Sequence, residues 1–175
     1  MGLGGQGAPE ASGTLVAETR QLLSLLPPDS KLIVNDRADV AQLTGAAGVH
    51  LGQDDLPAAA ARALLGPDKI IGWSTHTLEQ VEQGNALPVD YLAFGPVFAT
   101  TTKADTQPVV GLEGLQAARA RTRKPLVAIG GITAENAAQA LASGADSVAV
   151  IAGWMAAPDI PARLEEFRRT LGRLD

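Results

Sequence analysis

Cysteine is absent from this chain of 175 residues, which excludes disulfide bonds and thiolate chemistry and is compatible with a cytoplasmic location. Aromatic residues make up only 3% of the sequence and hydrophobic residues 46%, so the core must be built mainly from Ala, Val, Leu and Ile. No apolar run approaches the about 20 residues that a membrane-spanning helix needs. The amino terminus has neither a basic start nor an apolar run, so we expect no secretory signal there.

Positive charge is also scarce, since 14 Lys and Arg stand against 19 Asp and Glu, giving a net charge of -5. Because no basic cluster is visible, we expect neither a nucleic-acid partner nor a membrane. A negatively charged protein can still bind phosphate groups where backbone amides, lysines or a metal ion supply local attraction. Small-molecule substrates therefore remain open, and so does a homo-oligomeric state.

Short apolar runs alternate with amphipathic stretches along the chain, which is the pattern of repeated βα units. The runs are nearly continuous in Val, Ile, Leu and Ala, as expected for parallel strands covered on both faces. The predicted strands cover residues 31–36, 48–52, 70–74, 91–97, 125–131 and 147–153. The predicted helices cover residues 14–26, 38–45, 57–65, 77–85, 112–121, 134–143 and 160–171. We predict one domain over residues 14–175, preceded by a flexible segment at 1–13.

Six parallel strands suit either an open doubly wound sheet or a barrel. No G-x-G-x-x-G follows the first strand, which disfavours a dinucleotide-binding sheet. Polar residues and glycines lie at or just beyond the carboxyl ends of different strands, and in a barrel those ends converge on one rim. We therefore predict an α/β fold of the TIM-type (β/α) barrel. The residues concerned are Asp36, Asp55, Ser74, Thr100, Thr102, Lys103, Gly130 and Gly131.

Two carboxylates follow the first two predicted strands, Asp36 in NDR and Asp55 in QDD. A carboxylate pair beside phosphate-binding groups suits Mg²⁺, which commonly takes one or two carboxylates together with phosphate oxygens and waters. The alternative is that each aspartate caps the helix that follows it. Spacing alone leaves both interpretations open.

The segment GPVFATTTKAD, residues 95–105, offers three hydroxyls, a lysine and backbone amides after a buried strand. Such a loop can hold phosphate by hydrogen bonds, with Lys103 adding a compact positive charge. The alternative is a polar surface loop. The glycine pair in AIGGIT also has two interpretations. The glycines either let the backbone approach a phosphate closely, or they form an ordinary turn after the strand. His50 and His76 have no partner pattern for a metal or a catalytic triad, and Trp73 and Trp154 are best explained by core packing.

Taken together, NDR, GVHLGQDDLP, IGWSTHT, YLAFGPVFATTTK, VGLEGL and AIGGITAEN resemble the thiamine phosphate synthase family over residues 31–153. The family resemblance implies a transferase of thiamine biosynthesis that joins hydroxymethylpyrimidine diphosphate to thiazole phosphate and releases pyrophosphate. The related thiazole tautomerases share the barrel, but HLGQDDLP and GPVFATTTK are closer to the synthase.

The resemblance also implies a role for particular residues. It makes Asp36 and Asp55 the ligands of Mg²⁺, and it makes Lys103 and Ser74 the catalytic residues. Asn35, Ser74 and Lys103 contact the pyrimidine diphosphate in this scheme. The thiazole phosphate is bound by Thr100, Thr101 and Thr102 and by the phosphate-binding set Gly131, Ile151 and Ala152.

The chain departs from the family pattern in two places. Ala152 replaces a serine that the family usually has, which keeps the backbone amide and loses a hydroxyl. The family's first strand, first helix and most of its second strand have no counterpart, so we expect an incomplete barrel. Residues 2–6, GLGGQ, stand where the family has Gln-Leu-Arg-Glu-Lys. The alternatives to a synthase are therefore a shortened, inactive module that binds thiazole phosphate, and a thiazole tautomerase.

Overall fold

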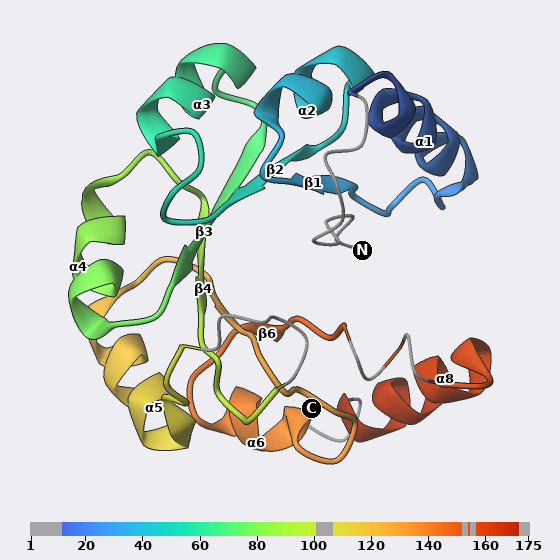
Figure 1. Ribbon diagram of the computed structural model, residues 1–175. Coiled ribbons are helices and arrows are strands. Elements are labelled where there is room, and N and C mark those ends of the chain that lie inside the picture. The colour runs from blue at the N-terminus through green and yellow to red at the C-terminus, as the bar shows by residue number, and fades with distance from the viewer. Residues whose placement is uncertain (1–11, 101–106, 152–153, 155–156, 172–175) are drawn as a thin grey trace. The chain divides into compact units, whose positions relative to one another are not determined.

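The computed structural model describes residues 12–100, 107–151, 154 and 157–171, over which helices and strands alternate (Figure 1). The strands are β1 (Ile33–Asn35), β2 (Gly48–Leu51), β3 (Ile70–Thr75), β4 (Tyr91–Phe94), β5 (Leu126–Ala128) and β6 (Ser147–Val148). The helices are α1 (Ser12–Leu25), α2 (Ala38–Thr44), α3 (Ala58–Leu65), α4 (Leu78–Ala86), α5 (Gly111–Arg121), α6 (Ala137–Ala142) and α8 (Ile160–Leu171).

The strands form one sheet in chain order, from β1 to β6. The paired strands run parallel, with Val34 opposite Val49 in β1 and β2, and Ala93 opposite Val127 in β4 and β5. This arrangement confirms the prediction of an α/β fold with about six parallel strands. None of the described helices combines the length and apolar character needed to cross a membrane.

The chain divides into two compact units. The first unit is Met1–Trp73 with Leu87–Asp90, and the second is Ser74–Ala86 with Tyr91–Asp175. The prediction of a single domain over 14–175 stays a prediction, and most of the predicted flexible segment, 1–13, lies outside the described residues.

The core of the first unit is aliphatic. Figure 1 shows α2 and α3 following one another along the strands of this unit. The side chains between these layers are at most 4% exposed, and each fully buried Val, Leu or Ile side chain contributes about 1.5–3 kcal/mol. They are Val34, Val40, Ala41, Val49, Leu51, Ala61 and Ile71.

The second unit repeats this packing with α4, α5 and α6 beside its strands (Figure 1). Its buried side chains are also mostly aliphatic, with Phe94 as the largest. The others of this group, all 1% exposed or less, are Val81, Leu92, Ala93, Val97, Leu115, Ala118, Leu126, Ala128, Ala137 and Ala140. The expectation of a core poor in aromatic residues therefore describes both units.

The ends of several elements differ from the sequence prediction. Strand β6 has two residues, whereas 147–153 was the predicted span, although the Ala149 N–H still donates to the Ala128 carbonyl. Helix α6 begins at Ala137, three residues later than predicted, because the Asn136 side chain accepts the Thr133 N–H and so holds 133–136 in a turn. Apolar character continues past each strand end, which is why the sequence pattern overestimates strand length.

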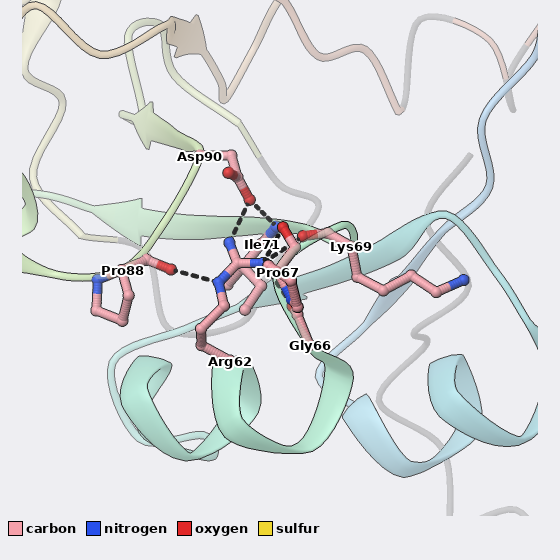
Figure 2. Close-up of polar contacts among 7 residues, drawn as sticks. All are labelled: Arg62, Gly66, Pro67, Lys69, Ile71, Pro88 and Asp90. Atoms are coloured by element: carbon pink, nitrogen blue, oxygen red, sulfur yellow. Dashed lines mark hydrogen bonds and ion pairs between the residues drawn. The ribbon is translucent and has the colours of Figure 1, made fainter.

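An arginine on α3 ties together two segments of the first unit, the start of β3 and the residues 87–90 that precede β4 (Figure 2). Arg62 donates to the carbonyls of Gly66 and Lys69, at 3.0 and 2.6 Å, and to Asp90 Oδ2 at 2.6 Å. The same Asp90 oxygen accepts the Ile71 N–H at 2.6 Å, and the Asp90 N–H donates to the Ile71 carbonyl. One ion pair thus fixes a helix, the loop after it and two chain segments at the start of β3 and β4.

The same arrangement recurs in the second unit at the start of β5 and β6. Arg119 on α5 donates to Asp146 Oδ2 at 2.7 Å and to the carbonyls of Thr122 and Lys124. Asp146 Oδ2 accepts the Leu126 N–H at 2.7 Å, and the Asp146 N–H donates to the Leu126 carbonyl. We call these two arrangements the Arg62–Asp90 clamp and the Arg119–Asp146 clamp. Both lie at strand amino ends, the side of a (β/α) barrel that serves stability and not chemistry.

Replacing Asp90 with alanine should lower the free energy of unfolding by about 1–3 kcal/mol, because the Ile71 N–H and Arg62 lose their shared acceptor. Asp146→Ala should cost a similar amount in the other clamp. The matched control is Asp68→Ala, since Asp68 is exposed and makes no side-chain hydrogen bond or ion pair within the described ranges. Urea denaturation measures all three. Equal unfolding midpoints for Asp90→Ala and Asp68→Ala would contradict the clamp's role.

Candidate active site

Asp36 directly follows β1 and has an unusual backbone conformation. Its φ is 61°, and it is the one residue other than glycine with positive φ among the described residues. Its N–H donates to the His50 carbonyl at 2.8 Å, which extends the pairing of β1 with β2 by one residue. Aspartate tolerates this left-handed conformation better than most residues, and such conformations cluster at functional sites. Asn35, the residue before Asp36, is half-buried at the end of β1.

Asp55 reaches back to the end of β2. Its Oδ2 accepts the N–H of Gly52, the first residue after that strand, at 2.6 Å. Within the part of the chain that the structure describes, no group donates to the other carboxylate oxygen, Oδ1. The Asp36 N–H thus binds His50, and the Asp55 carboxylate binds Gly52. His50 and Gly52 are two residues apart, which corresponds to about 7 Å along an extended strand. The first unit thus brings the Asp36 backbone and the Asp55 carboxylate to the end of β2.

Neither carboxylate caps the helix that follows it, so the alternative left open by the sequence is wrong for both. The N-cap of α2 is Arg37 and that of α3 is Pro57, and neither end has a side-chain capping bond. Asp55 instead uses its carboxylate on the strand, as described above.

Arg37, although adjacent to Asp36, is committed to another carboxylate. Its Nε and Nη2 donate to the two oxygens of Asp39 at 2.8 and 2.6 Å, and Nη2 also donates to Ser12. The hydrogen bond from Arg37 holds the pKa of Asp39 below its ordinary value, and the reciprocal bond raises the pKa of Arg37. The pair is on the surface, so it contributes little to stability, but it keeps this guanidinium occupied within its own turn.

The second unit holds the other predicted residues. Ser74 lies in β3 one residue before its end and is half-buried. Thr75, next to it, is fully buried and donates its hydroxyl to the Ala93 carbonyl at 2.9 Å, so its role is structural. His76 follows the strand, and its Nδ1 lies 2.7 Å from the Gly95 carbonyl oxygen. Sequence reasoning found no such partner for His76.

The segment after β4 continues to pair with the segment after β5. Val97 and Phe98 donate their N–H groups to the carbonyls of Ile129 and Gly130, at 2.8 and 3.0 Å. This pairing leads the chain to Thr100, which is half-buried and has polar partners. The predicted substrate-binding residues Thr101, Thr102 and Lys103 lie outside the described residues.

The glycine pair after β5 is required by this packing. Gly130 and Gly131 have φ values of 85° and 66°, and a Cβ on Gly131 would lie 2.5 Å from the Ala99 carbonyl oxygen. Asn136 holds the turn from the other side, because its Nδ2 donates to the Gly131 carbonyl and its Oδ1 accepts the Thr133 N–H. Sequence reasoning missed this role of Asn136, although a carboxamide five residues after Gly-Gly is a recognisable signal.

The remaining predicted residues lie beyond β6. Ile151 is 56% exposed, three residues past the end of the strand, and Ala152 lies outside the described residues. Trp154 stacks on buried Phe167 with ring centroids 5.0 Å apart, and Trp73 is 9% exposed, so both tryptophans pack as predicted. No group of three or more metal-binding side chains occurs within the described residues.

Replacing Gly131 with alanine should destabilise the protein by about 2–5 kcal/mol. The estimate combines about 1–2 kcal/mol for a left-handed alanine with about 1–3 kcal/mol for forcing a methyl group against backbone atoms. Gly45→Ala is the matched control, because Gly45 also has positive φ, 75°, but an added Cβ would meet nothing within 4 Å. Chemical denaturation should show the larger loss for Gly131→Ala. Equal losses for the two variants would show that the close approach to Ala99 is not tight.

Comparison with known proteins adds an independent observation. The family model described as thiamine monophosphate synthase matches residues 11–153. A thiamine-phosphate synthase from Azorhizobium caulinodans is 50% identical over 93% of this chain and 76% of its own length. One from Koribacter versatilis is 49% identical over 90% of this chain and 74% of its own length. The chain thus spans about three quarters of these relatives.

The fold agrees with the sequence match. Thiamine phosphate pyrophosphorylase from Pyrococcus furiosus superimposes with a TM-score of 0.84 and 35% identity, covering 99% of this chain and 81% of that protein. This likeness confirms the prediction of a TIM-type (β/α) fold, incomplete at six parallel strands. The carboxylates at the ends of β1 and β2, the glycine turn after β5 and both comparisons lead to one conclusion: this chain belongs to the thiamine monophosphate synthase family.

Proposed function

We propose that this protein is a transferase that joins hydroxymethylpyrimidine diphosphate to thiazole phosphate, with release of pyrophosphate, in the cytoplasm. The observation that carries the proposal is that two aspartates contact the end of β2: the Asp36 N–H donates to the His50 carbonyl, and the Asp55 carboxylate accepts the Gly52 N–H. The names of the relatives support a synthase over a thiazole tautomerase and over an inactive binding module.

The carboxylate pair fits Mg²⁺ by its chemistry. Hard oxygen donors suit this ion, and it commonly takes one or two carboxylates while waters and substrate phosphates fill its other positions. Asp55 still has Oδ1 available within the described residues, and Asp39 already occupies the neighbouring cation, Arg37. In our proposal Asp36 and Asp55 hold the ion. When bound, Mg²⁺ supplies positive charge to the diphosphate oxygens.

The reaction breaks the bond between the pyrimidine methylene carbon and the diphosphate oxygen, and the thiazole nitrogen then bonds to that carbon. Negative charge collects on the departing pyrophosphate while the methylene becomes cation-like. A lysine near the leaving group stabilises the first change, and we assign this role to Lys103. Ser74 and Asn35 would orient the pyrimidine diphosphate by hydrogen bonds, so that the reacting atoms meet in a favourable geometry.

The thiazole phosphate would be bound by the segments after β4, β5 and β6. Thr100, Thr101 and Thr102 would contact this substrate, and the backbone amides of Gly131, Ile151 and Ala152 would receive its phosphate. Within the described residues the Gly131 N–H donates to no protein acceptor, while its carbonyl is held by Asn136. The Gly130 carbonyl, which shares a planar peptide with this N–H, accepts the Phe98 N–H at 3.0 Å and so sets the direction of the N–H, which supports a role in binding an anion.

The purified chain, given both substrates and Mg²⁺, should release pyrophosphate, and removal of the ion with EDTA should stop the reaction. Lys103→Ala should lower kcat by about 100-fold or more, because a charge that stabilises the leaving group is lost. Thiazole phosphate binding, measured by calorimetry, should change little. Lys31→Ala is the control, since Lys31 is exposed and far along the sequence from the proposed site residues of the second unit.

The alternative functions make different predictions for the same assay. Binding of thiazole phosphate without any pyrophosphate release by the unmodified chain would favour the shortened binding module. Conversion of a thiazole substrate in the absence of the pyrimidine diphosphate would favour a tautomerase. Full turnover by Lys103→Ala would contradict our assignment of the lysine.

A further inference from the structure

His76 has a fixed ring orientation. Its Nδ1 lies 2.7 Å from the carbonyl oxygen of Gly95, the first residue after β4. A carbonyl oxygen only accepts, so Nδ1 must carry the hydrogen of this bond, which leaves Nε2 as the acceptor nitrogen of the neutral ring. The side chain is half-buried, and within the described residues Nε2 has no hydrogen-bond partner.

The backbone that carries His76 is held as firmly as the ring. The Gln80 side chain on α4 accepts the N–H groups of His76 and Thr77, at 2.6 and 3.3 Å. In return, the Gln80 N–H donates to the Thr77 hydroxyl at 3.3 Å, which is the reciprocal pattern of a capping box. Helix α4 therefore fixes the position from which the imidazole reaches Gly95.

Gly95 is bound through both of its polar backbone groups by the segment at the end of β3. Its N–H donates to the Thr75 carbonyl at 3.2 Å, and its carbonyl accepts from His76. On the opposite side, a Cβ at Gly95 would lie 2.1 Å from the Ile129 carbonyl oxygen, so the backbone has little freedom there. The peptide that begins the segment 95–100 is thus oriented by one side chain, that of His76.

The orientation of this peptide is passed along the segment. Two residues later, Val97 and then Phe98 donate to Ile129 and Gly130, and the chain next reaches Thr100. Because the peptide is planar, a rotation of the Gly95 carbonyl would turn the whole peptide between residues 95 and 96. The backbone dihedral angles that lead to Val97 would have to change with it, which would disturb these bonds. The segment with the proposed thiazole contacts therefore depends on the Nδ1–H bond of His76.

We propose that His76 is a positioning residue for the thiazole phosphate: its Nδ1–H holds the Gly95 carbonyl and so sets the segment 95–100, which ends at the hydroxyl of Thr100. This inference rests on the proposed function. It assigns His76 no contact with either substrate and no proton transfer. Its loss should therefore raise the KM for thiazole phosphate and leave the KM for the pyrimidine diphosphate nearly unchanged.

Two amide substitutions separate positioning through Nδ1 from a substrate contact through Nε2. The Nδ2 of asparagine lies about where Nδ1 of histidine lies, whereas the Nε2 of glutamine lies about where Nε2 lies. His76→Asn should therefore keep the bond to Gly95, while His76→Gln and His76→Ala should lose it. We expect the KM for thiazole phosphate to rise about tenfold in the latter two, the equivalent of one hydrogen bond, and at most about threefold in His76→Asn. Thr77→Ser, which alters the same turn but keeps the hydroxyl that accepts the Gln80 N–H, should match the unmodified protein.

Steady-state kinetics with each substrate varied in turn measures these effects at a temperature where circular dichroism shows all variants to be folded. Rescue by glutamine and not by asparagine would overturn the proposal in favour of a contact through Nε2. Unchanged constants in His76→Ala would also overturn it, and so would equal rises in the KM of both substrates. Absence of turnover in the unmodified protein would instead contradict the proposed function itself, so the two failures are distinguishable.

Discussion

Parallel pairing of neighbouring strands in register is the constraint on which the candidate site depends. In the first unit, the pairing of Asn35 with His50 places Asp36 beside the end of β2, where Gly52 binds the carboxylate of Asp55. In the second unit, Phe94 pairs with Ala128, and the same ladder extends through Val97 and Phe98 to the glycine turn. A shift of one residue in either ladder would separate these groups and turn the side chains to the opposite face.

The two clamps act at the opposite, amino-terminal ends of the strands: one joins the start of β3 to the segment before β4, and the other joins the start of β5 to the segment before β6. Each uses one aspartate oxygen to accept both an arginine and a strand N–H, so the helix, the loop and the strands at that end are fixed together. The aspartates are about half exposed, which limits the electrostatic part of the contribution. The directional hydrogen bonds give the clamps their effect, and they leave the carboxyl ends of the strands for binding and chemistry.

The sequence predicted the elements well and their ends less well. Periodic apolar residues indicated the six described strands and the helices α1 to α6 and α8, because a buried parallel strand and an amphipathic helix leave different patterns. The pattern could not show that Asp36 has positive φ or that Asp55 turns back to Gly52 instead of capping α3. It also gave no sign of the bonds from His76 to Gly95 and from Asn136 to Gly131, since these contacts depend on how the loops pack in three dimensions. Motif resemblance supplied the candidate residues, and the structure supplied the reasons for their positions.

The most direct test of this account is a calorimetric titration of Mg²⁺ and pyrophosphate into the unmodified protein, Asp36→Asn, Asp55→Asn and the double variant. If the two carboxylates share one ion, either single substitution should remove most of the Mg²⁺-dependent binding of pyrophosphate, and the double variant should be little worse than either. Independent, additive losses, or binding that survives both substitutions, would contradict the claim that strand register brings Asp36 and Asp55 together to hold the ion.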